Sequence, residues 1–356
     1  MFLVSPESQE LNMLYTHLGR TGLQVSRLCL GTMNFGPLTD EATAFRIMDT
    51  AIDAGVTFFD TANVYGSWGQ DSRTHSGWTE EIVGRWFALG DGRRERVVLA
   101  TKVFGTMNDP LDGPNDEGGY SAYKIKRSVE ASLKRLGTDR IELYQMHHIY
   151  THAPWDEVWG AFEDLISTGK VVYAGASNFG ARHLCWAQEA AKNRHFLGLV
   201  SEQHKYSLLT RQPELEVLPA ALELGLGVIP WSPLAGGLLG GHALDGQGGD
   251  RSSTAARGLD ESTQARLVRF HDLAAQSGHS PANLALAWTL ANPAVTAPII
   301  GPRTPTQLEE TLVVPEIRLD ADLLAALDDV FPGPGDPGTG ADPASRRATA
   351  PWSYAW

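Results

Sequence analysis

The sequence is poor in cysteine and contains no long apolar run. Cys29 and Cys185 are its two cysteines among 356 residues, and each stands in a short apolar run. Such isolated cysteines are typical of buried free thiols in a reducing compartment, so we expect a cytoplasmic protein without disulfides. No run approaches the roughly 18 to 20 apolar residues that a membrane-spanning helix needs. Residues 2–4 are too few for the apolar part of a secretory signal.

Basic residues are also scarce. Lys and Arg number 29 against 42 Asp and Glu, which leaves a formal net charge of -13. An acidic chain without a local basic patch repels nucleic acid and anionic membranes, so we expect neither as a partner. Metal ligands are not clustered either: His147 and His148 are adjacent, should point to opposite faces of a strand and have no third ligand spaced nearby. We therefore expect no metal site.

Short β-rich apolar runs alternate with amphipathic stretches of helical period along most of the chain. The runs lie at 27–30, 57–60, 97–101, 141–146, 171–175, 199–202, 227–231 and 297–300. Helical stretches follow at 41–54, 79–88, 122–136, 155–168, 181–193, 213–224, 261–276 with 281–290, and 305–312. Eight such units favour the α/β class and a closed (β/α)8 TIM barrel over an open doubly wound sheet.

Domain organisation follows from the same alternation. We expect one barrel domain over residues 13–331, a disordered extension at 1–12 and an irregular tail at 332–356 that ends in aromatic residues. The Gly- and Ser-rich stretch 236–258 is too long for an ordinary connection and follows the seventh strand. Long loops at that place in a barrel commonly serve ligands, so it is predicted to clamp a cofactor.

Polar residues stand where several predicted strands end. In a barrel the active site lies at the carboxyl ends of the strands, and these ends carry Asp60, Lys102 and His147. A buried ammonium needs a partner, so we predict an ion pair between Lys102 and Asp60. Tyr65, on the loop after Asp60, can fold back over Lys102, which would lower the tyrosine pKa toward the range of a general acid. His147 would then hydrogen-bond the substrate oxygen.

The motifs around these four residues resemble the aldo-keto reductase superfamily. They are GVTFFDTANVYG at 55–66, VVLATK ending at Lys102, and LYQMHH at 143–148. GKVVYAGASNF at 169–179, SEQHKYSLL at 201–209, IPWSPLAGGLL at 229–239 and IIGPRTPTQLEET at 299–311 follow in the family's order. The resemblance covers residues 15–329. It implies hydride transfer from C4 of a nicotinamide to a carbonyl-type substrate, with Tyr65 as proton donor.

The same resemblance implies a set of cofactor contacts. Two cations, Arg251 and Arg303, suit a 2′-phosphate because guanidinium pairs well with phosphate, so the implied cofactor is NADPH. The residues implied to hold it, from carboxamide to adenosine, are Gly31, Thr32, Met33, Asp60, Ser177, Asn178, Gln203, Trp231, Ser232, Pro233, Leu234, Gly236, Arg251, Gly301, Arg303, Gln307 and Glu310. The chain departs from the family at Thr311, where an asparagine is common, and at His242, where part of the family has lysine.

The substrate is left open between a simple aldehyde or ketone and a nucleotide-sugar enone of deoxysugar pathways. YQMHHI and EQHKY resemble a branch that includes both kinds of reductase. A sugar nucleotide would need donors for its diphosphate, for which His148, Arg73 and Lys124 are the candidates. A second hypothesis is an NADPH-binding regulatory subunit, because IPWSPLAGG and Gln307 also resemble potassium-channel β-subunits. Whether the chain forms a homo-oligomer is left open as well.

Two other patterns are interpreted as coincidences. Tyr120 and Lys124 have the spacing of the short-chain dehydrogenases, but no strand with a Gly-rich turn begins the chain. Glycines 333, 335 and 338 fit a dinucleotide fingerprint, but they stand in a Pro-rich tail without the strand and helix that the fingerprint needs.

Overall fold

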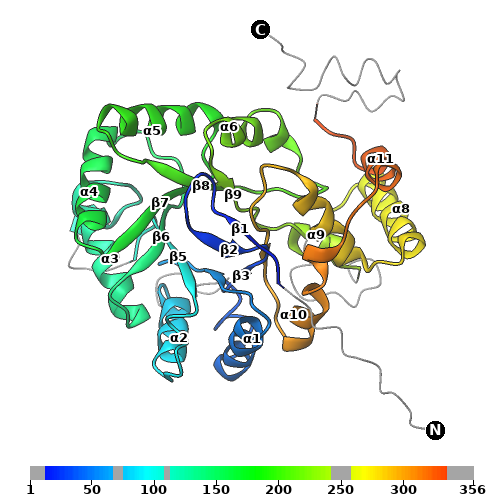
Figure 1. Ribbon diagram of the computed structural model, residues 1–356, viewed down its shortest axis with the longest axis horizontal. Coiled ribbons are helices and arrows are strands. Elements are labelled where there is room, and N and C mark those ends of the chain that lie inside the picture. The colour runs from blue at the N-terminus through cyan, green and yellow to red at the C-terminus, as the bar shows by residue number, and fades with distance from the viewer. Residues whose placement is uncertain (1–12, 67–74, 108–112, 242–257, 335–356) are drawn as a thin grey trace.

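The computed structural model describes residues 13–66, 75–107, 113–241 and 258–334. Eight parallel strands form its centre in the order β10-β3-β4-β5-β6-β7-β8-β9, with helices around them (Figure 1). The strands are β3 Cys29–Gly31, β4 Phe58–Asp60, β5 Val98–Val103, β6 Ile141–Met146, β7 Val171–Ser177, β8 Leu199–Gln203, β9 Gly227–Val228 and β10 Ile299–Ile300. Each overlaps one of the predicted runs, so all eight predicted strands are confirmed.

The sheet closes on itself between β9 and the segment that leads into β10. The backbone N–H of Ile299 donates to the carbonyl oxygen of Pro230 at 2.8 Å. Val228 donates to Ala294 at 3.0 Å and accepts from Thr296 at 2.8 Å. These bonds join the two ends of the strand order, so the sheet has no free edge there. The predicted (β/α)8 barrel is confirmed.

The helices of the outer layer largely follow the prediction. Ser121 caps the first turn of the third helix by accepting from the N–H of Lys124, and Gly137 ends that helix with a φ of 61°. Because such caps are local, the predicted bounds 122–136 are met at both ends. The bounds 181–193 are met as well, although that helix has no side-chain cap at its start. The helices are α1 Glu41–Asp53, α2 Trp78–Phe87, α3 Ala122–Leu136, α4 Trp155–Ser167, α5 Ala181–Asn193, α6 Val217–Glu223, α8 Glu261–Ser277, α9 Pro281–Ala291, α10 Pro305–Thr311 and α11 Ala321–Val330.

Two helical features differ from the prediction. The helix expected at 213–224 is divided into the short 3₁₀ helix η2 Gln212–Glu214 and α6. Pro219 accounts for the division: it has no N–H, and restarting the helix at Val217 places this proline in the first turn, where no hydrogen bond is lost. The helix α11 was not predicted. Three further 3₁₀ helices are η1 Gly113–Asp116, η3 Ala235–Gly240 and η4 Val314–Glu316.

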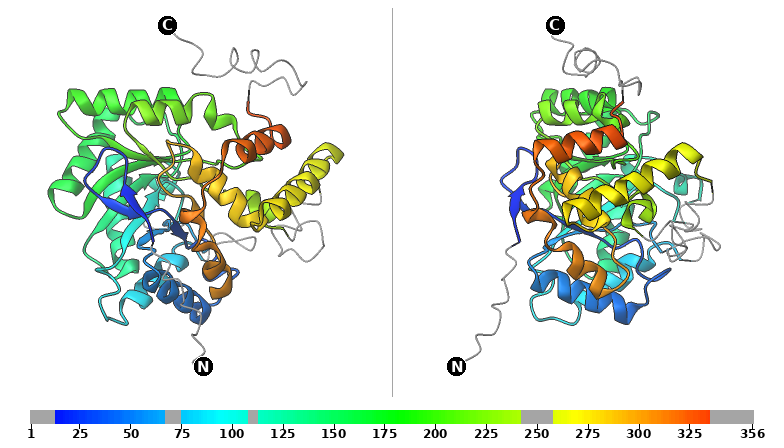
Figure 2. Two further views of the ribbon diagram at one scale, coloured as in Figure 1. Left: turned by 45° about the vertical axis from the view of Figure 1, so that its right-hand side comes forward. Right: turned by 90° about the vertical axis from the view of Figure 1, so that its right-hand side faces the viewer.

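A β-hairpin covers the amino-terminal end of the barrel. Its strands β1 Tyr15–His17 and β2 Gln24–Ser26 pair antiparallel, and the right-hand view of Figure 2 shows it outside the barrel strands. Gly19, in the turn, has a φ of +54°, and a Cβ there would lie 2.5 to 2.7 Å from backbone atoms of Gly225, Val200 and Gly227. Only glycine fits this contact, which seats the hairpin at the start of β8 and β9.

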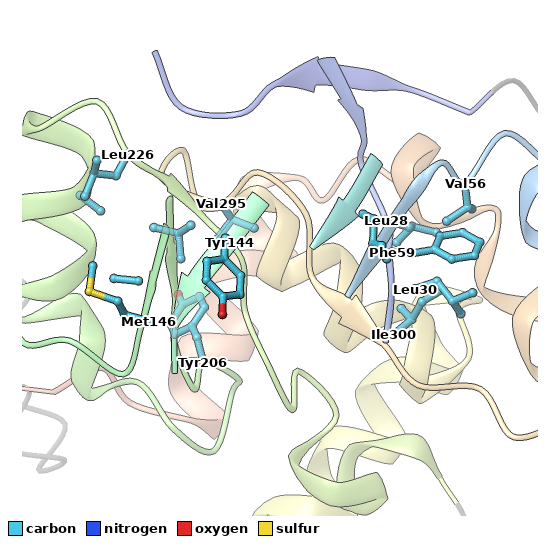
Figure 3. Close-up of a cluster of buried hydrophobic side chains, with 14 of the residues drawn as sticks. Leu28, Leu30, Val56, Phe59, Tyr144, Met146, Tyr206, Leu226, Val295 and Ile300 are labelled. Atoms are coloured by element: carbon cyan, nitrogen blue, oxygen red, sulfur yellow. The ribbon is translucent and has the colours of Figure 1, made fainter. Parts of the chain in front are cut away.

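Two apolar cores result from the alternation of side chains along the strands. Phe59 packs outward with Leu28, Leu30 and Val56 between sheet and helices (Figure 3), whereas its neighbour Phe58 points into the barrel. The inner core, here called the apolar layer, is fully buried and consists of Leu18, Val25, Cys29, Phe58, Ala100, Leu143, Val200, Ile229 and Ala297. The hairpin thus supplies two of its members and closes the barrel below the site.

Both cysteines are free, as predicted, but only Cys29 is buried. The prediction of burial was wrong for Cys185, because the inward face of α5 is formed by Leu184, Ala187 and Ala191, and Cys185 lies one residue further round the helix. No helix in the described ranges is long and apolar enough to cross a membrane. The predicted extension 1–12, most of the clamp loop and the tail from 335 onward lie outside the described residues.

Candidate active site

A polar layer lies directly above the apolar layer inside the barrel. Side chains two positions apart on a strand share a face, so Asp60 follows Phe58 and Lys102 follows Ala100 on the inner surface. Gln145 on β6 stands beside Lys102 in the parallel register. Asp60 is 2% exposed and Lys102, Gln145 and Gln203 are equally buried. We call Asp60, Lys102, Gln145 and Gln203 the polar layer.

Lys102 is the centre of this layer. Its Nζ donates to Asp60 Oδ2 at 2.6 Å, to the carbonyl oxygen of Thr61 at 2.8 Å and to Tyr65 Oη at 3.0 Å. Burial by itself lowers the pKa of this ammonium, but the negative charge of Asp60 and the contact with Tyr65 outweigh burial and raise the Lys102 pKa. Lys102 is therefore charged at neutral pH. An ammonium at this distance can stabilise negative charge on a phenolic oxygen.

The second oxygen of Asp60 is held by two amides. Gln145 Nε2 donates to Asp60 Oδ1 at 3.0 Å and Gln203 Nε2 donates to the same atom at 2.7 Å. Gln203 also donates to Gln145 Oε1 at 3.2 Å. Gln203, implied by resemblance to hold the carboxamide, is thus tied into the Asp60 network, and Gln145 was missed. A polar residue at an inward strand position just before the LYQMHH histidines is the signal that could have found Gln145.

Tyr65 and His147 face each other above the polar layer. Their ring centroids are 5.9 Å apart with an edge-on angle of 77°. The backbone of Tyr65 is fixed because its carbonyl accepts from the N–H groups of Gly77 and Thr79 at the start of α2. Burial, then Lys102 and His148, lower the His147 pKa well below its usual value. His147 is therefore neutral at pH 7 and can donate or accept one hydrogen bond.

His147 and His148 do not point to opposite faces, and that expectation was wrong. Their rings stack at 4.7 Å with an angle of 5°. The pleat ends with β6 at Met146, so alternation no longer applies. Tyr120 fixes this backbone, since its Oη accepts from the N–H of His148 at 2.9 Å and donates to the carbonyl of His148 at 2.5 Å. The tyrosine of the discounted Tyr120–Lys124 pair therefore has a structural role beside the site.

Asn178 connects four strand ends. Its φ is 62°, and its backbone N–H donates to the carbonyl of Gln203 at 3.0 Å. Its Nδ2 donates to the carbonyl of His147 and to Ser177 Oγ, both at 3.0 Å, and its Oδ1 accepts from Trp231 Nε1 at 3.1 Å. Ser177, Asn178, Gln203 and Trp231 are thus brought together beside His147.

The first strand end is packed closely. Thr32 donates through both its backbone N–H and Oγ1 to the carbonyl of Asp60 at 3.0 Å. A Cβ on Gly31 would lie 2.4 Å from Ile299 Cγ2, so only glycine lets β3 and β10 approach here. Met33 is partly buried beside them.

The stretch after β9 has an unusual backbone. Ser232 and Ala235 have φ values of 52° and 50°, and Gly236 and Gly237 follow at 70° and 99°. Leu234, just before, is at φ -96°, so a right-handed residue is followed by three left-handed ones. The turn is closed by its own backbone, since the N–H of Ala235 donates to the carbonyl of Ser232 and the N–H of Gly237 donates to the carbonyl of Leu234, both at 2.9 Å. Pro233 is buried at the start of this turn.

Some of the residues that the resemblance implies for the adenosine end of the cofactor lie in the described part of the chain. Asn34 Nδ2 donates to the carbonyl of Gly301 at 2.8 Å, and Gln307 Oε1 accepts from the N–H of Arg303 at 2.9 Å. The carbonyl of Glu310 accepts from Asn283 Nδ2 at 2.9 Å. Arg251 and His242 lie outside the described residues. Among the described residues no three His, Cys, Asp or Glu side chains gather as metal ligands.

Comparisons with known proteins identify the family to which this barrel belongs. The family model "Aldo/keto reductase family" matches residues 27–331, so the chain belongs to that family and is one of its oxidoreductases. It is 58% identical to "Uncharacterized oxidoreductase YrpG" of Bacillus subtilis over 97% of this chain and 100% of that protein.

More distant relatives carry different names. The chain is 30% identical to "Versiconal hemiacetal acetate reductase" of Aspergillus parasiticus over 90% of this chain and 97% of that protein. It is 34% identical to "Probable voltage-gated potassium channel subunit beta" of Oryza sativa over 84% of this chain and 90% of that protein.

Proposed function

We propose that this protein reduces an aldehyde, ketone or enone with NADPH and that Tyr65 donates the proton. The observation that carries the proposal is the 3.0 Å contact between Lys102 Nζ and Tyr65 Oη, with the same ammonium paired to Asp60 at 2.6 Å. When the proton passes to the substrate oxygen, negative charge remains on Tyr65 Oη beside a fixed cation. Neutral His147 donates a hydrogen bond to that substrate oxygen and orients it. Bound NADPH supplies the hydride.

The residues present fit this cofactor. Ser177, Asn178 and Trp231 offer a hydroxyl, an amide and an indole at one place beside His147. The resemblance assigns the pyrophosphate to the stretch after Trp231, where left-handed glycines at 236 and 237 leave the backbone without bulky side chains. Arg303, with Arg251, suits the 2′-phosphate. These features favour NADPH extended from the polar layer across the barrel mouth toward α10.

An apolar carbonyl compound fits the mouth better than a sugar nucleotide. Phe104, just past β5, meets the ring of His148 at 5.2 Å and that of Tyr150 at 6.2 Å, so aromatic side chains continue outward from His147. Lys124, a candidate donor to a diphosphate, already uses its Nζ to donate to the carbonyls of Asp116 and Glu117 at 2.8 Å each. Arg73 lies outside the described residues. A wall of rings favours a planar apolar substrate over a diphosphate.

The test is NADPH consumption with 4-nitrobenzaldehyde by the wild type and Tyr65→Phe. Loss of a general acid is expected to lower kcat about 10²- to 10⁴-fold. Tyr123→Leu, on an exposed tyrosine of α3, is the control and is expected to retain the wild-type rate. Equal rates for the wild type and Tyr65→Phe would contradict the role of Tyr65.

A second candidate function is an NADPH-binding regulatory subunit, which the relative from Oryza sativa favours by its name. Tight NADPH binding without turnover of any compound in a broad carbonyl panel would support it against the reductase. Tryptophan-fluorescence titration with NADH and NADPH measures cofactor preference. Equal affinity for NADH and NADPH would contradict the assignment of the two arginines to a 2′-phosphate.

Free thiols at Cys29 and Cys185 fit the proposed cytoplasmic location.

A further inference from the structure

Glu202 is a fully buried carboxyl group directly behind Asn178. Its neighbour Gln203 points into the barrel, so the side chain of Glu202 points to the outside of β8. Its Oε1 accepts from the N–H of Phe179 at 2.9 Å, and Nδ1 of His204 lies 2.8 Å from the same atom. Its Oε2 is buried and has no hydrogen-bond partner among the described residues.

A buried carboxyl group with this environment lowers the stability of the fold. Burial raises the pKa of Glu202 to about 7, although His204 and the N–H groups of Phe179 and Asn178 act in the opposite direction. A buried carboxyl group with one unsatisfied oxygen costs stability, whereas an apolar side chain of similar volume would fill the same place without that cost. Packing alone therefore does not explain a glutamate here.

The backbone that Glu202 holds is the turn that carries Asn178. Phe179, whose N–H bonds to Glu202, follows the left-handed residue Asn178 directly. Few residues other than glycine adopt the left-handed conformation, and here the bonds from the N–H groups of Asn178 and Phe179 hold it. Through its side chain this asparagine reaches the carbonyl of His147 and the indole of Trp231. A shift of the turn would therefore move contacts on both sides of the position proposed for the nicotinamide ring.

We propose that Glu202 is a positioning residue that locks the Asn178 turn and so sets the affinity for the nicotinamide end of NADPH. The inference rests on the proposed function for the identity of the cofactor. An ionised carboxylate accepts the N–H of Phe179 more strongly than a neutral acid does. The turn is consequently held more firmly above pH 7 than below it, and cofactor affinity rises with pH through this range.

Among the residues that the structure describes, two titratable groups interact with Glu202. His204 comes from the end of β8, and Tyr120 comes from the segment before α3. Burial raises the pKa of Tyr120 well above 10, so this phenol is neutral throughout the range of interest. Because His204 lowers the Glu202 pKa, a variant of either residue should change the pH dependence of cofactor binding.

The experiment measures the NADPH dissociation constant by tryptophan fluorescence at pH 6 and pH 8. Glu202→Gln is expected to bind about 5- to 10-fold more weakly than the wild type at pH 8, because it has lost a charged acceptor. At pH 6, where the wild-type carboxyl is protonated, the two proteins should bind within about twofold of each other. Titration of the NADPH phosphate is common to both proteins and cancels in this ratio.

Glu214→Gln is the matched control. Glu214 is also a buried glutamate, but it binds Arg211 and Tyr206, away from Asn178. This variant should lower the Tm and leave the NADPH dissociation constant unchanged at both pH values. His204→Leu removes a group that lowers the Glu202 pKa, so the pH profile of binding should move to higher pH. It keeps the test decisive if Glu202→Gln fails to fold.

The binding measurements separate failure of the positioning role from failure of the proposed function. A ratio between Glu202→Gln and the wild type that is the same at both pH values, or an unshifted profile in His204→Leu, would overturn the positioning role and leave the reductase proposal intact. Absence of NADPH binding by the wild type at any pH would overturn the proposed function and this inference together. A pH-dependent ratio with an unchanged Glu214→Gln control supports the inference.

Discussion

The barrel interior has two layers built from the same strands, and they differ completely in chemistry. The apolar layer, with Phe58, Ala100 and Leu143, is sealed by the hairpin. The polar layer, two residues further along each strand, replaces these with Asp60, Lys102 and Gln145. Apolar side chains stabilise the fold by leaving water. The buried charges do not, since their desolvation offsets their attraction. Under the proposed function, the lower layer supplies stability and the upper layer supplies reactivity.

The largest effect that separates the two layers is expected from Lys102→Met. Removing one partner leaves Asp60 charged and unpaired, which should cost about 3–5 kcal/mol of unfolding free energy, and kcat should fall about 10²- to 10⁴-fold. The double variant Asp60→Asn with Lys102→Met has no unpaired charge. Urea unfolding should show that it regains most of the stability while its NADPH consumption stays low. Recovery of activity in the double variant would break the comparison.

A smaller effect, in stability alone, is expected from Leu143→Ala in the apolar layer. The cavity left by this fully buried side chain should lower the unfolding free energy by about 2–5 kcal/mol. Urea unfolding measures this loss, and kcat per folded molecule is expected to stay within about twofold because the polar layer keeps its own hydrogen bonds. Leu222→Ala, at a side chain 55% exposed on α6, is the control. A large loss of kcat in Leu143→Ala would mean that the layers are not separable.

The smallest effect concerns His147 and pH. Its folded pKa is depressed, so below about pH 6.5 the unfolded chain binds a proton that the folded chain does not bind. This contribution to stability is complete above the unfolded pKa and is lost as the pH falls toward the folded pKa. Between pH 7.5 and 5.5 the wild type should therefore lose about 1 kcal/mol more than His147→Gln. Equal losses in urea unfolding at the two pH values would contradict burial of a neutral imidazole.

Local signals explain how much of the fold was predictable. The caps Ser121 and Gly137 bound α3 within the sequence itself, and the strand runs needed only their apolar pattern. The hairpin and α11 were missed because a three-residue strand and a short helix have little periodicity of their own. Their place depends on what they pack against.

The candidate site was predictable where a residue type alone limits its chemistry. A lysine, an aspartate and a histidine at strand ends are rare enough to be noticed. Gln145 was not noticed, because a glutamine on a strand can equally face solvent. The parallel stacking of His147 and His148 also escaped prediction, since it depends on where β6 ends and on how Tyr120 holds the chain beyond that end.

The sequence by itself determined the order of the βα units and which side chain stands at each strand end. Only the tertiary structure decided which of these side chains meet. Lys102 and Asp60 are 42 residues apart, and Gln203 is 143 residues from the same carboxylate. Contacts of that separation arise from the register between neighbouring strands and from closure of the sheet between β9 and β10. Local periodicity contains neither, because both are properties of how distant segments pair.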